Sequence, residues 1–392
     1  MSNEVLFDVV IIGCGPAGNK LAYNLGTKGI KVLLLDKASL PRNKRCGGGI
    51  SRKTIENIGY SVDGVIEKEM EGSYLTFRNE VITYKHMPGV GLMVERAKFD
   101  YFMTRKAVDA GAKLCEETEF ESYEERPEYV EIKTNNGIFK AKILVGADGV
   151  YSKVRKIMHP SKKIRLGHAI LALLYPRDGI LEAFGMNSMF DFGGIIAGYG
   201  WIFPKRDHFS IGLFKTRNSK NNMKMKSILN EFISRNKVLR NYEHIDIKCY
   251  PIPLKPISKD LAVGRVLLVG DAAGLGESFY GEGIYYALWS ANIASDAILD
   301  YLEKSIPLES YNKKIRVISR NLFFSRLTAR IFYAIPRFGY HQMVRNKWVN
   351  YYFSQLIYGK VDHTECFIKT LVYFPLWIFA PKYDPIDDSH LK

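Results

Sequence analysis

The sequence predicts an α/β protein in which a Rossmann-like domain is interrupted by an antiparallel sheet and followed by a helical C-terminal region. Three glycine-rich turns predict the Rossmann-like domain: Gly13–Gly18, Gly146–Gly149 and Gly270–Gly274. Each turn follows a short apolar run, as expected for strands buried on both faces of a parallel sheet. One such turn is weak evidence, but three in this order indicate that one elongated dinucleotide, held at both ends, organises the fold.

The first turn has the context that dinucleotide binding requires. A β-branched apolar run precedes it and a helical pattern follows it. Gly13 permits the tight turn, Gly15 lets the backbone approach a pyrophosphate, and Gly18 allows close packing of strand and helix. The small Ala17 belongs to the same predicted site. The helix N-terminus offers free N–H groups and a positive dipole end to the phosphates.

The second strand predicts how the adenosine ribose is held. The apolar run Val32–Leu35 ends at Asp36, whose carboxylate is placed to accept hydrogen bonds from the ribose hydroxyls. Lys37 follows, so charge alone does not exclude a 2′-phosphate, but Asp36 argues against one.

The pattern changes between about residues 164 and 253, where short and alternating apolar runs predict an antiparallel sheet within an α+β substrate part. A strand and a long helix over residues 264–302 then return the chain to the Rossmann-like domain, and helices are predicted over residues 329–340 and 344–356. We therefore predict a discontinuous dinucleotide-binding domain, a substrate-binding sheet domain and a C-terminal helical region. The dinucleotide-binding domain covers residues 1–70, 96–158 and 259–302. The sheet domain covers residues 71–95 and 159–258, and the helical region covers residues 303–392.

Composition narrows the class of protein. With 47% hydrophobic and 25% charged residues, the chain of 392 residues is globular. The net charge of +15 fits a lysine-rich background, an anionic lipid surface or a phosphate-bearing substrate, whereas no motif for nucleic acid accompanies it. Five scattered cysteines and eight histidines show no disulfide or metal-binding spacing, so we predict no metal.

No run reaches the roughly 18–20 apolar residues of a membrane span, and no basic segment of a secretory signal opens the chain. We therefore expect a cytoplasmic protein, with peripheral binding at the inner face of the cell membrane as an option.

Four segments carry a resemblance to a known family. They are Gly13–Gly18, residues 146–155, Gly270–Gly274 with residues 281–284, and Tyr199–Pro204 (YGWIFP). Together they resemble the flavoprotein superfamily of p-hydroxybenzoate hydroxylase and, within it, the geranylgeranyl reductase family, whose members include digeranylgeranylglycerophospholipid reductases. The match covers about residues 5–300. The resemblance implies an FAD-dependent oxidoreductase that acts on CH–CH bonds.

The resemblance also implies further cofactor contacts. It places the loop of Cys46, Gly47 and Gly48 beside the flavin ring, Arg96 near the phosphates or the ribose, and Asp148 near the pyrophosphate. It also places Asp271 and Ala272 along the ribityl chain, and Gly283 and Ile284 at a helix start facing the ring. Plain alternatives stay open. Arg96 also fits a solvated surface arginine, Asp148 a turn cap, and Cys46 a small loop residue. Ile196 and Ser278 stand where the family often has proline, which bears on substrate identity more than on flavin binding.

The aromatic motif is predicted to form the substrate slot. Alternation along a strand places Tyr199, Trp201 and Phe203 on one side. Their rings would line an apolar slot and tolerate positive character in an alkene. An isolated prenyl double bond is not polarised, so we expect protonation of one carbon to accompany hydride delivery to the other. We predict Cys46, Tyr199 and Trp201 as catalytic residues, the alternative being that the aromatic rings are sheet core.

These features favour an FAD-dependent reductase of geranylgeranyl chains on archaeal-type ether phospholipids. Alternatives are the same chemistry on a prenylquinone or chlorophyll precursor, an FAD-dependent monooxygenase or halogenase, and a non-catalytic protein that binds prenylated partners. Halogenases carry W-x-W-x-I-P, from which Tyr199–Pro204 departs at two places. No second nucleotide fold or iron–sulfur ligand set is evident, so we expect an external electron donor, reduced ferredoxin or NAD(P)H.

Overall fold

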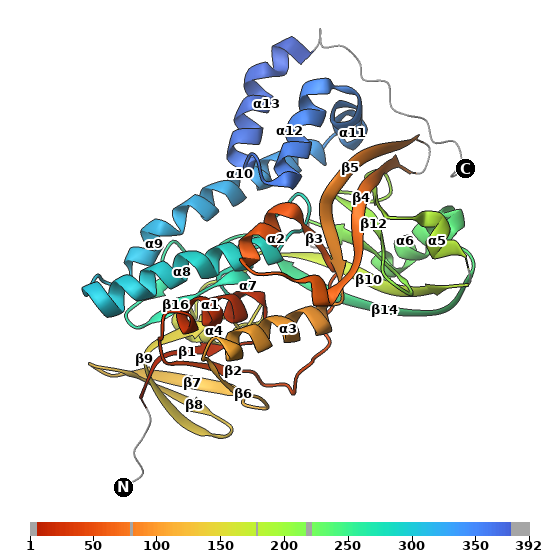
Figure 1. Ribbon diagram of the computed structural model, residues 1–392. Coiled ribbons are helices and arrows are strands. Elements are labelled where there is room, and N and C mark those ends of the chain that lie inside the picture. Colours follow the sequence, from red (N-terminus) through yellow and green to blue (C-terminus); the bar gives the residue numbers. More distant parts are fainter. Residues whose placement is uncertain (1–5, 79–80, 178, 217–221, 378–392) are drawn as a thin grey trace.

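A computed structural model describes residues 6–78, 81–177, 179–216 and 222–377 (Figure 1). Within these ranges the strands form two eight-stranded sheets, and the last four helices stand together at one end of the molecule. The predicted α/β class, with a Rossmann-like part, a second sheet and a helical C-terminal region, is confirmed.

The first sheet is the Rossmann-like sheet. Its strands are β1 (Leu6–Ile12), β2 (Val32–Leu35), β6 (Lys113–Cys115), β7 (Phe120–Glu125), β8 (Val130–Thr134), β9 (Gly137–Gly146), β15 (Ala262–Val263) and β16 (Val266–Leu268). The order is β15-β16-β9-β1-β2-β6, and β8 and then β7 extend from β9. The five central strands from β16 to β6 run parallel, as the buried apolar runs predict.

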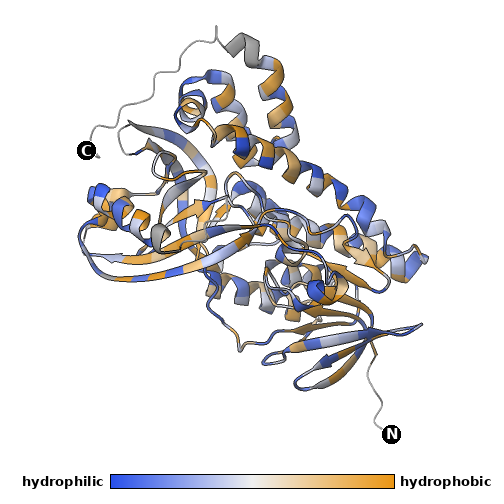
Figure 2. Ribbon diagram, turned by 180° about the vertical axis from the view of Figure 1, so that it is seen from behind, coloured by the Kyte–Doolittle hydropathy of each residue, from blue (hydrophilic) through white to orange (hydrophobic). Residues whose placement is uncertain are grey.

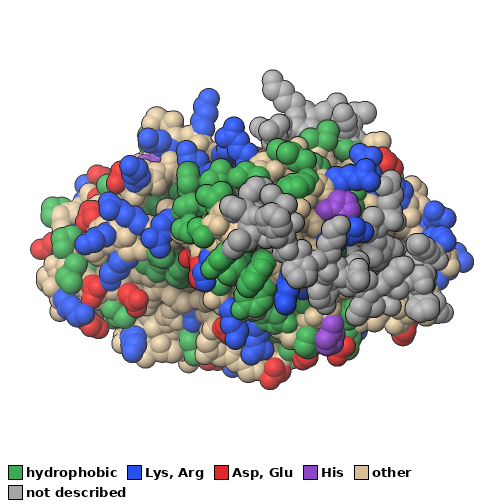
Figure 3. All heavy atoms as spheres, turned by 90° about the horizontal axis from the view of Figure 1, so that it is seen from above, with side chains coloured by type: hydrophobic (Ala, Val, Ile, Leu, Met, Phe, Trp, Pro, Cys, Tyr) green, Lys and Arg blue, Asp and Glu red, His purple; other side chains and the backbone are tan. Residues whose placement is uncertain are grey.

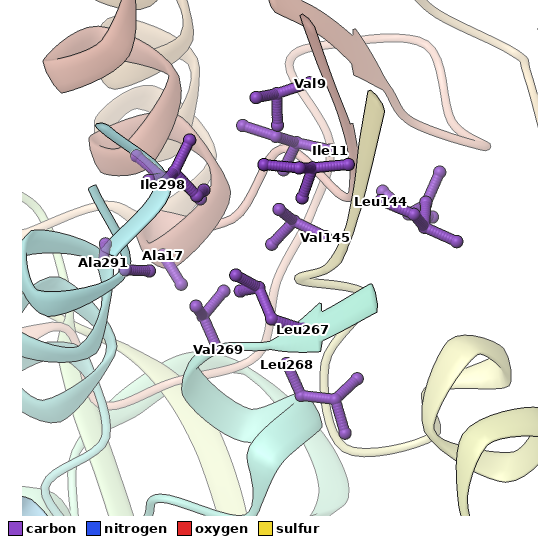
Figure 4. Close-up of a cluster of buried hydrophobic side chains, with 14 of the residues drawn as sticks. Val9, Ile11, Ala17, Leu144, Val145, Leu267, Leu268, Val269, Ala291 and Ile298 are labelled. Carbon is purple, nitrogen blue, oxygen red and sulfur yellow. The ribbon is translucent and has the colours of Figure 1, made fainter. Parts of the chain in front are cut away.

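Helices from both ends of the chain accompany this sheet. They are α1 (Pro16–Gly26), α2 (Arg52–Ile58), α3 (Arg96–Asp109), α4 (Lys153–Met158), α7 (Gly270–Ala273), α8 (Ile284–Lys304) and α9 (Ser310–Lys314). Figure 4 shows Val9 and Ile11 of β1 and Val145 of β9 on the side of the sheet where Ile298 of α8 also lies. All these side chains are fully buried, so α1 and α8 share one hydrophobic core with the strands.

The second sheet is mixed. Its strands are β3 (Gly49–Ser51), β4 (Ile66–Phe77), β5 (Val81–Val94), β10 (Leu166–Pro176), β11 (Asn187–Asp191), β12 (Gly198–Pro204), β13 (Phe209–Lys215) and β14 (Tyr242–Pro253). The order is β14-β10-β13-β12-β11-β4-β5-β3. The predicted antiparallel pairing is wrong at one place, because β11 pairs in parallel with β4, which an earlier part of the chain contributes. Helices α5 (Ile180–Phe184) and α6 (Asn222–Arg235) accompany this sheet.

The division into three domains stays a proposal. One detail bears on it, because β3 lies within residues 1–70 and yet belongs to the second sheet, through antiparallel pairing with β5. The Cys46–Gly49 loop therefore lies where the two sheets meet.

The C-terminal region contains α10 (Arg316–Phe332), α11 (Pro336–Arg345), α12 (Lys347–Tyr358) and α13 (His363–Trp377). The predicted single helix over residues 329–340 is wrong, because Pro336 lacks an N–H group and forces Ile335 out of the helical conformation. The helix predicted from residue 344 instead begins at Lys347, and the Asn346 side chain caps it by accepting bonds from two backbone N–H groups.

These helices are amphipathic and attached to the second sheet. Figure 2 shows hydrophobic and hydrophilic residues alternating along them. The Tyr340 hydroxyl of α11 donates to the Leu75 carbonyl of β4 at 3.0 Å, and the Tyr358 hydroxyl of α12 donates to the Pro88 carbonyl of β5 at 3.1 Å. In the described part of the chain, no helix combines the length and the apolar character needed to cross a membrane.

We expect Gly18→Ala to destabilise the fold, because an added Cβ would lie 2.0 Å from the Gly13 carbonyl oxygen, a contact that no side-chain rotation relieves. The free energy of unfolding in urea should fall by about 1–3 kcal/mol or more. Gly64→Ala is the matched control, since a Cβ there meets no atom within 4 Å. Equal stability of the two variants would contradict this account of the turn.

Candidate active site

Strand register brings the three glycine turns to one edge of the first sheet. Ile12 of β1 and Leu268 of β16 are both paired with Gly146 of β9, and each turn begins within two residues of this level. Strand β2 ends at the same level, because Leu35 pairs with Ile12. Carboxyl ends of parallel strands are where nucleotides bind in such folds. The predicted cofactor segments are therefore neighbours in space.

The glycines differ in what surrounds them. A Cβ on Gly13 would lie 2.6 Å from the Ala147 carbonyl oxygen, so this glycine packs on the second turn. A Cβ on Gly15 would meet only the Arg42 guanidinium, at 3.9 Å, and one on Gly283 only Asp271 Oδ1, at 3.6 Å. Open space therefore lies at Gly15 and Gly283, where the sequence predicts contact with the cofactor.

The two helix N-termini at these glycines also fit an anionic cofactor. Neither the N-cap Gly15 of α1 nor the N-cap Gly283 of α8 has a side chain that caps the helix, and neither first turn holds an acidic residue. Their N–H groups and positive dipole ends remain available to phosphate oxygens and to negative charge on a reduced flavin. Ala17 and Ile284 lie in these first turns. FAD fits this site.

The Asp36 carboxylate is already hydrogen-bonded to the first glycine turn and to the loop that follows β2. Its Oδ2 accepts bonds from the Cys14 backbone N–H at 2.9 Å and from Arg42 Nε at 3.2 Å, and its Oδ1 accepts from the Ala38 N–H at 3.0 Å. Carboxylate oxygens have further lone pairs, so ribose binding by Asp36 stays a prediction. Lys37 is exposed.

Arg96 is not a solvated surface arginine. It is buried at the start of α3 and donates two bonds of 2.8 Å to Asp100. Burial opposes its charge, but the Asp100 carboxylate and the Cys46 side chain outweigh that effect and raise the pKa of Arg96. The guanidinium thus links α3 to the cysteine loop, and its contact with the cofactor stays a prediction.

The other two turns are held together by Arg155. Its guanidinium donates to the Val150 carbonyl at 2.7 Å and to the Ala272 carbonyl at 3.2 Å. Asp148 Oδ2 accepts from the Lys153 N–H at 2.7 Å, which is the turn-capping role considered from the sequence. Asp148 Oδ1 is buried with no partner among the described residues, so one oxygen remains for a ligand.

A cavity of about 190 Å³ lies between the cysteine loop, the aromatic motif and the start of α8. Cys46, Gly47 and Gly48 line one side, and Gly283 and Ile284 line another. The predicted substrate residues Tyr199, Trp201 and Phe203 also line it. The structure therefore gathers the predicted substrate slot and the predicted flavin-ring contacts around one space.

The aromatic slot is tightly packed. Successive ring centroids of Tyr199, Trp201 and Phe203 are 6.2 and 6.1 Å apart. A Cβ on Gly47 would lie 3.2 Å from the Phe203 ring and 3.3 Å from Trp201 Nε1. The Tyr199 hydroxyl donates to the Tyr280 carbonyl in the loop before α8, whereas Trp201 Nε1 is buried without a hydrogen-bond partner in the described structure.

Lys205 is a site residue that the sequence analysis missed. Its ammonium is fully buried and donates to the carbonyls of Gly48, at 3.1 Å, and Val94, at 3.0 Å. Burial lowers the pKa of Lys205 to about 8, although the nearby side chains of Glu95, Cys46 and Glu67 oppose this. A lysine directly after the aromatic motif was the available signal, but its burial is a tertiary property.

The cavity also has a polar end that the sequence analysis did not predict. Lys53 Nζ lies 2.7 Å from a carboxylate oxygen of Glu282, whose other oxygen accepts from the Ser51 hydroxyl at 2.6 Å. Thr54 donates to the same carboxylate at 3.2 Å. These side chains join α2 to the loop before α8, at the cavity wall.

Glu277, also missed, anchors the loop before α8. It is fully buried and accepts bonds from the Phe279 and Tyr280 N–H groups and from the Ser325 hydroxyl of α10. Nε2 of His363, in α13, lies 3.6 Å from Oε1 of Glu277. Burial raises the pKa of Glu277 and lowers that of His363 well below its ordinary value. The C-terminal helices therefore hold a wall of the cavity.

Comparison with known proteins agrees with this geometry. The FAD binding domain family matches residues 6–164, which contain the first two turns. The protein is thus an FAD-dependent oxidoreductase.

A digeranylgeranylglycerophospholipid reductase of Methanosphaera stadtmanae is 31% identical over 301 residues, covering 73% of this chain and 76% of the relative. A geranylgeranyl diphosphate reductase of Rhodobacter capsulatus is 27% identical and covers 77% and 78%. The solved structure of a geranylgeranyl bacteriochlorophyll reductase-like protein from Thermoplasma acidophilum superposes with a TM-score of 0.79 at 21% identity, over 96% of this chain and 98% of that one. The chain belongs to the geranylgeranyl reductase family.

We expect Lys205→Met to loosen the cysteine loop. The Val94 N–H, which donates to the Gly48 carbonyl at 2.8 Å, should exchange with deuterium about ten times faster or more, because bonds from a charged donor are lost. Lys85→Met is the matched control. Burial also lowers the pKa of Lys85 to about 8, but Lys85 bonds Asn350 of α12. Unchanged exchange at Val94 in Lys205→Met would contradict the role of Lys205.

The shifted pKa of Lys205 also predicts a pH dependence. Between pH 8 and 10.5 the unfolded chain keeps the lysine proton while the folded chain releases it, so the unfolded state binds more protons. The stability of the wild type relative to Lys205→Met should therefore rise with pH across this window, by up to about 3 kcal/mol. Urea unfolding of both proteins at pH 7 and pH 10.5 measures this difference, and a constant difference would contradict it.

Proposed function

We propose that this enzyme saturates isolated double bonds of geranylgeranyl chains, above all those of archaeal-type ether phospholipids. The observation that carries the proposal is the apolar, aromatic cavity between the cysteine loop and the start of α8. Its largely apolar, aromatic lining suits a hydrocarbon chain of isoprene units rather than a polar substrate. The reductase names of the relatives support the same chemistry.

The chain's own residues would hold the alkene and manage charge. Bound FAD, once reduced, supplies the hydride. The faces of Tyr199 and Trp201 would stabilise positive character at the alkene carbon, while the packed aromatic walls exclude water. The N-terminus of α8 favours negative charge at the cofactor end of the cavity.

We assign the proton for the second alkene carbon to Cys46 Sγ. The thiol lines the cavity and interacts with Arg96. Lys205 holds the neighbouring Gly48 carbonyl and so keeps the loop against the aromatic motif. The bound-state distance between Cys46 and substrate is the quantity on which this assignment depends.

We extend the proposal to setting and partners. The electron donor would be external, reduced ferredoxin or NAD(P)H, and the enzyme would act from the cytoplasm at the inner face of the cell membrane, where its lipid substrate lies. Prenylquinone or a chlorophyll precursor would use the same cavity chemistry. A monooxygenase or halogenase would instead depend on oxygen or halide.

The decisive experiment is anaerobic incubation of the dithionite-reduced, FAD-loaded protein with geranylgeranylated ether lipid. Mass spectrometry should show product masses raised by pairs of hydrogen atoms. A parallel incubation with prenylquinone compares substrate classes. Absence of reduction for every prenyl substrate, with oxygen-dependent turnover in its place, would overturn the proposal.

We expect Trp201→Ala to lower alkene reduction at least about 100-fold while FAD stays bound, because the ring that packs on Gly47 and lines the slot is lost. Visible absorbance measures FAD content and mass spectrometry measures turnover. Trp348→Ala, which removes a partly exposed tryptophan far along the chain in α12, is the control and should keep turnover with a water-soluble prenyl substrate. Normal turnover by Trp201→Ala would contradict the role of the aromatic slot in alkene reduction.

A further inference from the structure

Exposed apolar side chains are concentrated in the C-terminal helices. Of the eighteen large hydrophobic residues exposed in the described structure, ten lie between residues 323 and 373, about one eighth of the chain. We call these ten residues the C-terminal apolar set: Phe323, Ile331, Ile335, Phe338, Trp348, Tyr351, Ile368, Leu371, Val372 and Tyr373. Single exposed apolar residues are ordinary, but such a concentration marks an interaction surface.

The members come from all four C-terminal helices and from the turn between α10 and α11. Ile335 and Phe338, with 62% and 50% of their surface exposed, belong to the turn between α10 and α11 and to the first turn of α11. Trp348, in the first turn of α12, stacks on Tyr373 of α13, with ring centroids 5.9 Å apart. Figure 3, which views the molecule from the end where these helices stand, shows hydrophobic side chains gathered there among Lys and Arg.

The charge around this set is strongly positive. Residues 316–373 contain nine lysines and arginines against two acidic residues. Arg330, Arg337 and Lys347 are exposed, and each is next in sequence to a member of the set. Basic residues interleaved with aromatic and aliphatic ones are typical of surfaces that lie in the headgroup region of anionic bilayers. Nucleic acid would explain the arginines but not exposed Ile335, Phe338 and Leu371.

The same helices reach the cavity from their other side. Ile357 of α12 lines it, and the Tyr333 hydroxyl at the end of α10 donates to the Phe279 carbonyl at 2.7 Å. Val349 and Phe353 of α12 belong to the hydrophobic cluster that contains Tyr199 and Trp201. The surface set and the substrate slot are thus opposite sides of one helical layer.

We propose that the C-terminal apolar set docks this enzyme on an anionic lipid bilayer, with α10–α13 lying in the interface. This inference rests on the proposed function, which gives the enzyme a membrane lipid as substrate. It fixes the orientation of the molecule, because docking through this set places the helical layer, and the slot behind it, against the membrane.

The test is sedimentation of the full-length, FAD-loaded protein with vesicles. We expect binding to vesicles of phosphatidylcholine with 30% phosphatidylglycerol (roughly the charge of an anionic leaflet) and weaker binding to phosphatidylcholine alone. The double variant Ile335→Asp/Phe338→Asp should bind anionic vesicles at least about tenfold more weakly, because two apolar side chains that would enter the bilayer become two charges that the anionic lipids repel. Ile138→Asp, at a β9 residue with 58% of its surface exposed, is the control and should bind like the wild type.

A binding partner other than a lipid bilayer would give different results in these experiments. If the double variant binds anionic vesicles like the wild type, or if Ile138→Asp loses as much, the proposal is overturned. The proposal is also overturned if the wild type does not bind vesicles and sedimentation velocity shows a dimer that is lost in the double variant. In that case a second copy of the chain would bind the C-terminal apolar set.

Water-soluble geranylgeranyl diphosphate separates this inference from the proposed function. Both the wild type and the double variant should reduce it equally, since neither residue lies in the cavity. Reduction of geranylgeranyl diphosphate by a protein that does not bind vesicles would contradict the docking inference but not the proposed function. Vesicle binding without any prenyl reduction would leave docking supported and sink the reductase proposal.

Discussion

The structure depends on the absence of side-chain atoms where the three glycine turns meet. Gly13 packs on the Ala147 carbonyl, Gly18 on the Gly13 carbonyl, and Gly270 on Ala17, at distances that leave no room for additional Cβ atoms at Gly13 and Gly18. This close contact keeps β1, β9 and β16 in register at their carboxyl ends. A dinucleotide site follows from that register, because two uncapped helix N-termini then face one edge of the sheet.

The cysteine loop extends this constraint to the second sheet. Gly47 faces the rings of Trp201 and Phe203 too closely for a larger residue to fit without displacement, and Gly48 adopts a left-handed conformation against the Val94 carbonyl. The buried Lys205 ammonium bonds both carbonyls that meet there. A charge at this depth is unfavourable, as its lowered pKa shows, so the bonds that hold the loop offset a real desolvation cost. Lys205 thereby helps to hold the loop that joins the cofactor edge of the first sheet to the substrate slot.

The sequence was sufficient to predict those parts of this arrangement that depend on residues close together in the chain. Strand, glycine turn and helix leave a pattern of fixed spacing, and the aromatic motif alternates along β12, so Tyr199, Trp201 and Phe203 line one cavity. Pairings between distant segments leave no such pattern. Nothing near Lys205 indicates that Gly48 and Val94 lie beside it, and Glu277 and His363 are 86 positions apart. The helix predicted through Pro336 is wrong for the opposite reason, because a local signal, the proline itself, ends one helix and begins the next.

Glu277 shows how the C-terminal helices take part in the site. A fully buried carboxyl group raises the free energy of the fold unless donors surround it, and here two backbone N–H groups and Ser325 do so. One of those donors comes from α10, and His363 of α13 lies against the same group. Removal of the helical layer would therefore take away the Ser325 donor and expose the Glu277 carboxyl to water beside the start of α8. The layer is part of the cavity wall, so any displacement of α10–α13 acts directly on the loop that leads into α8.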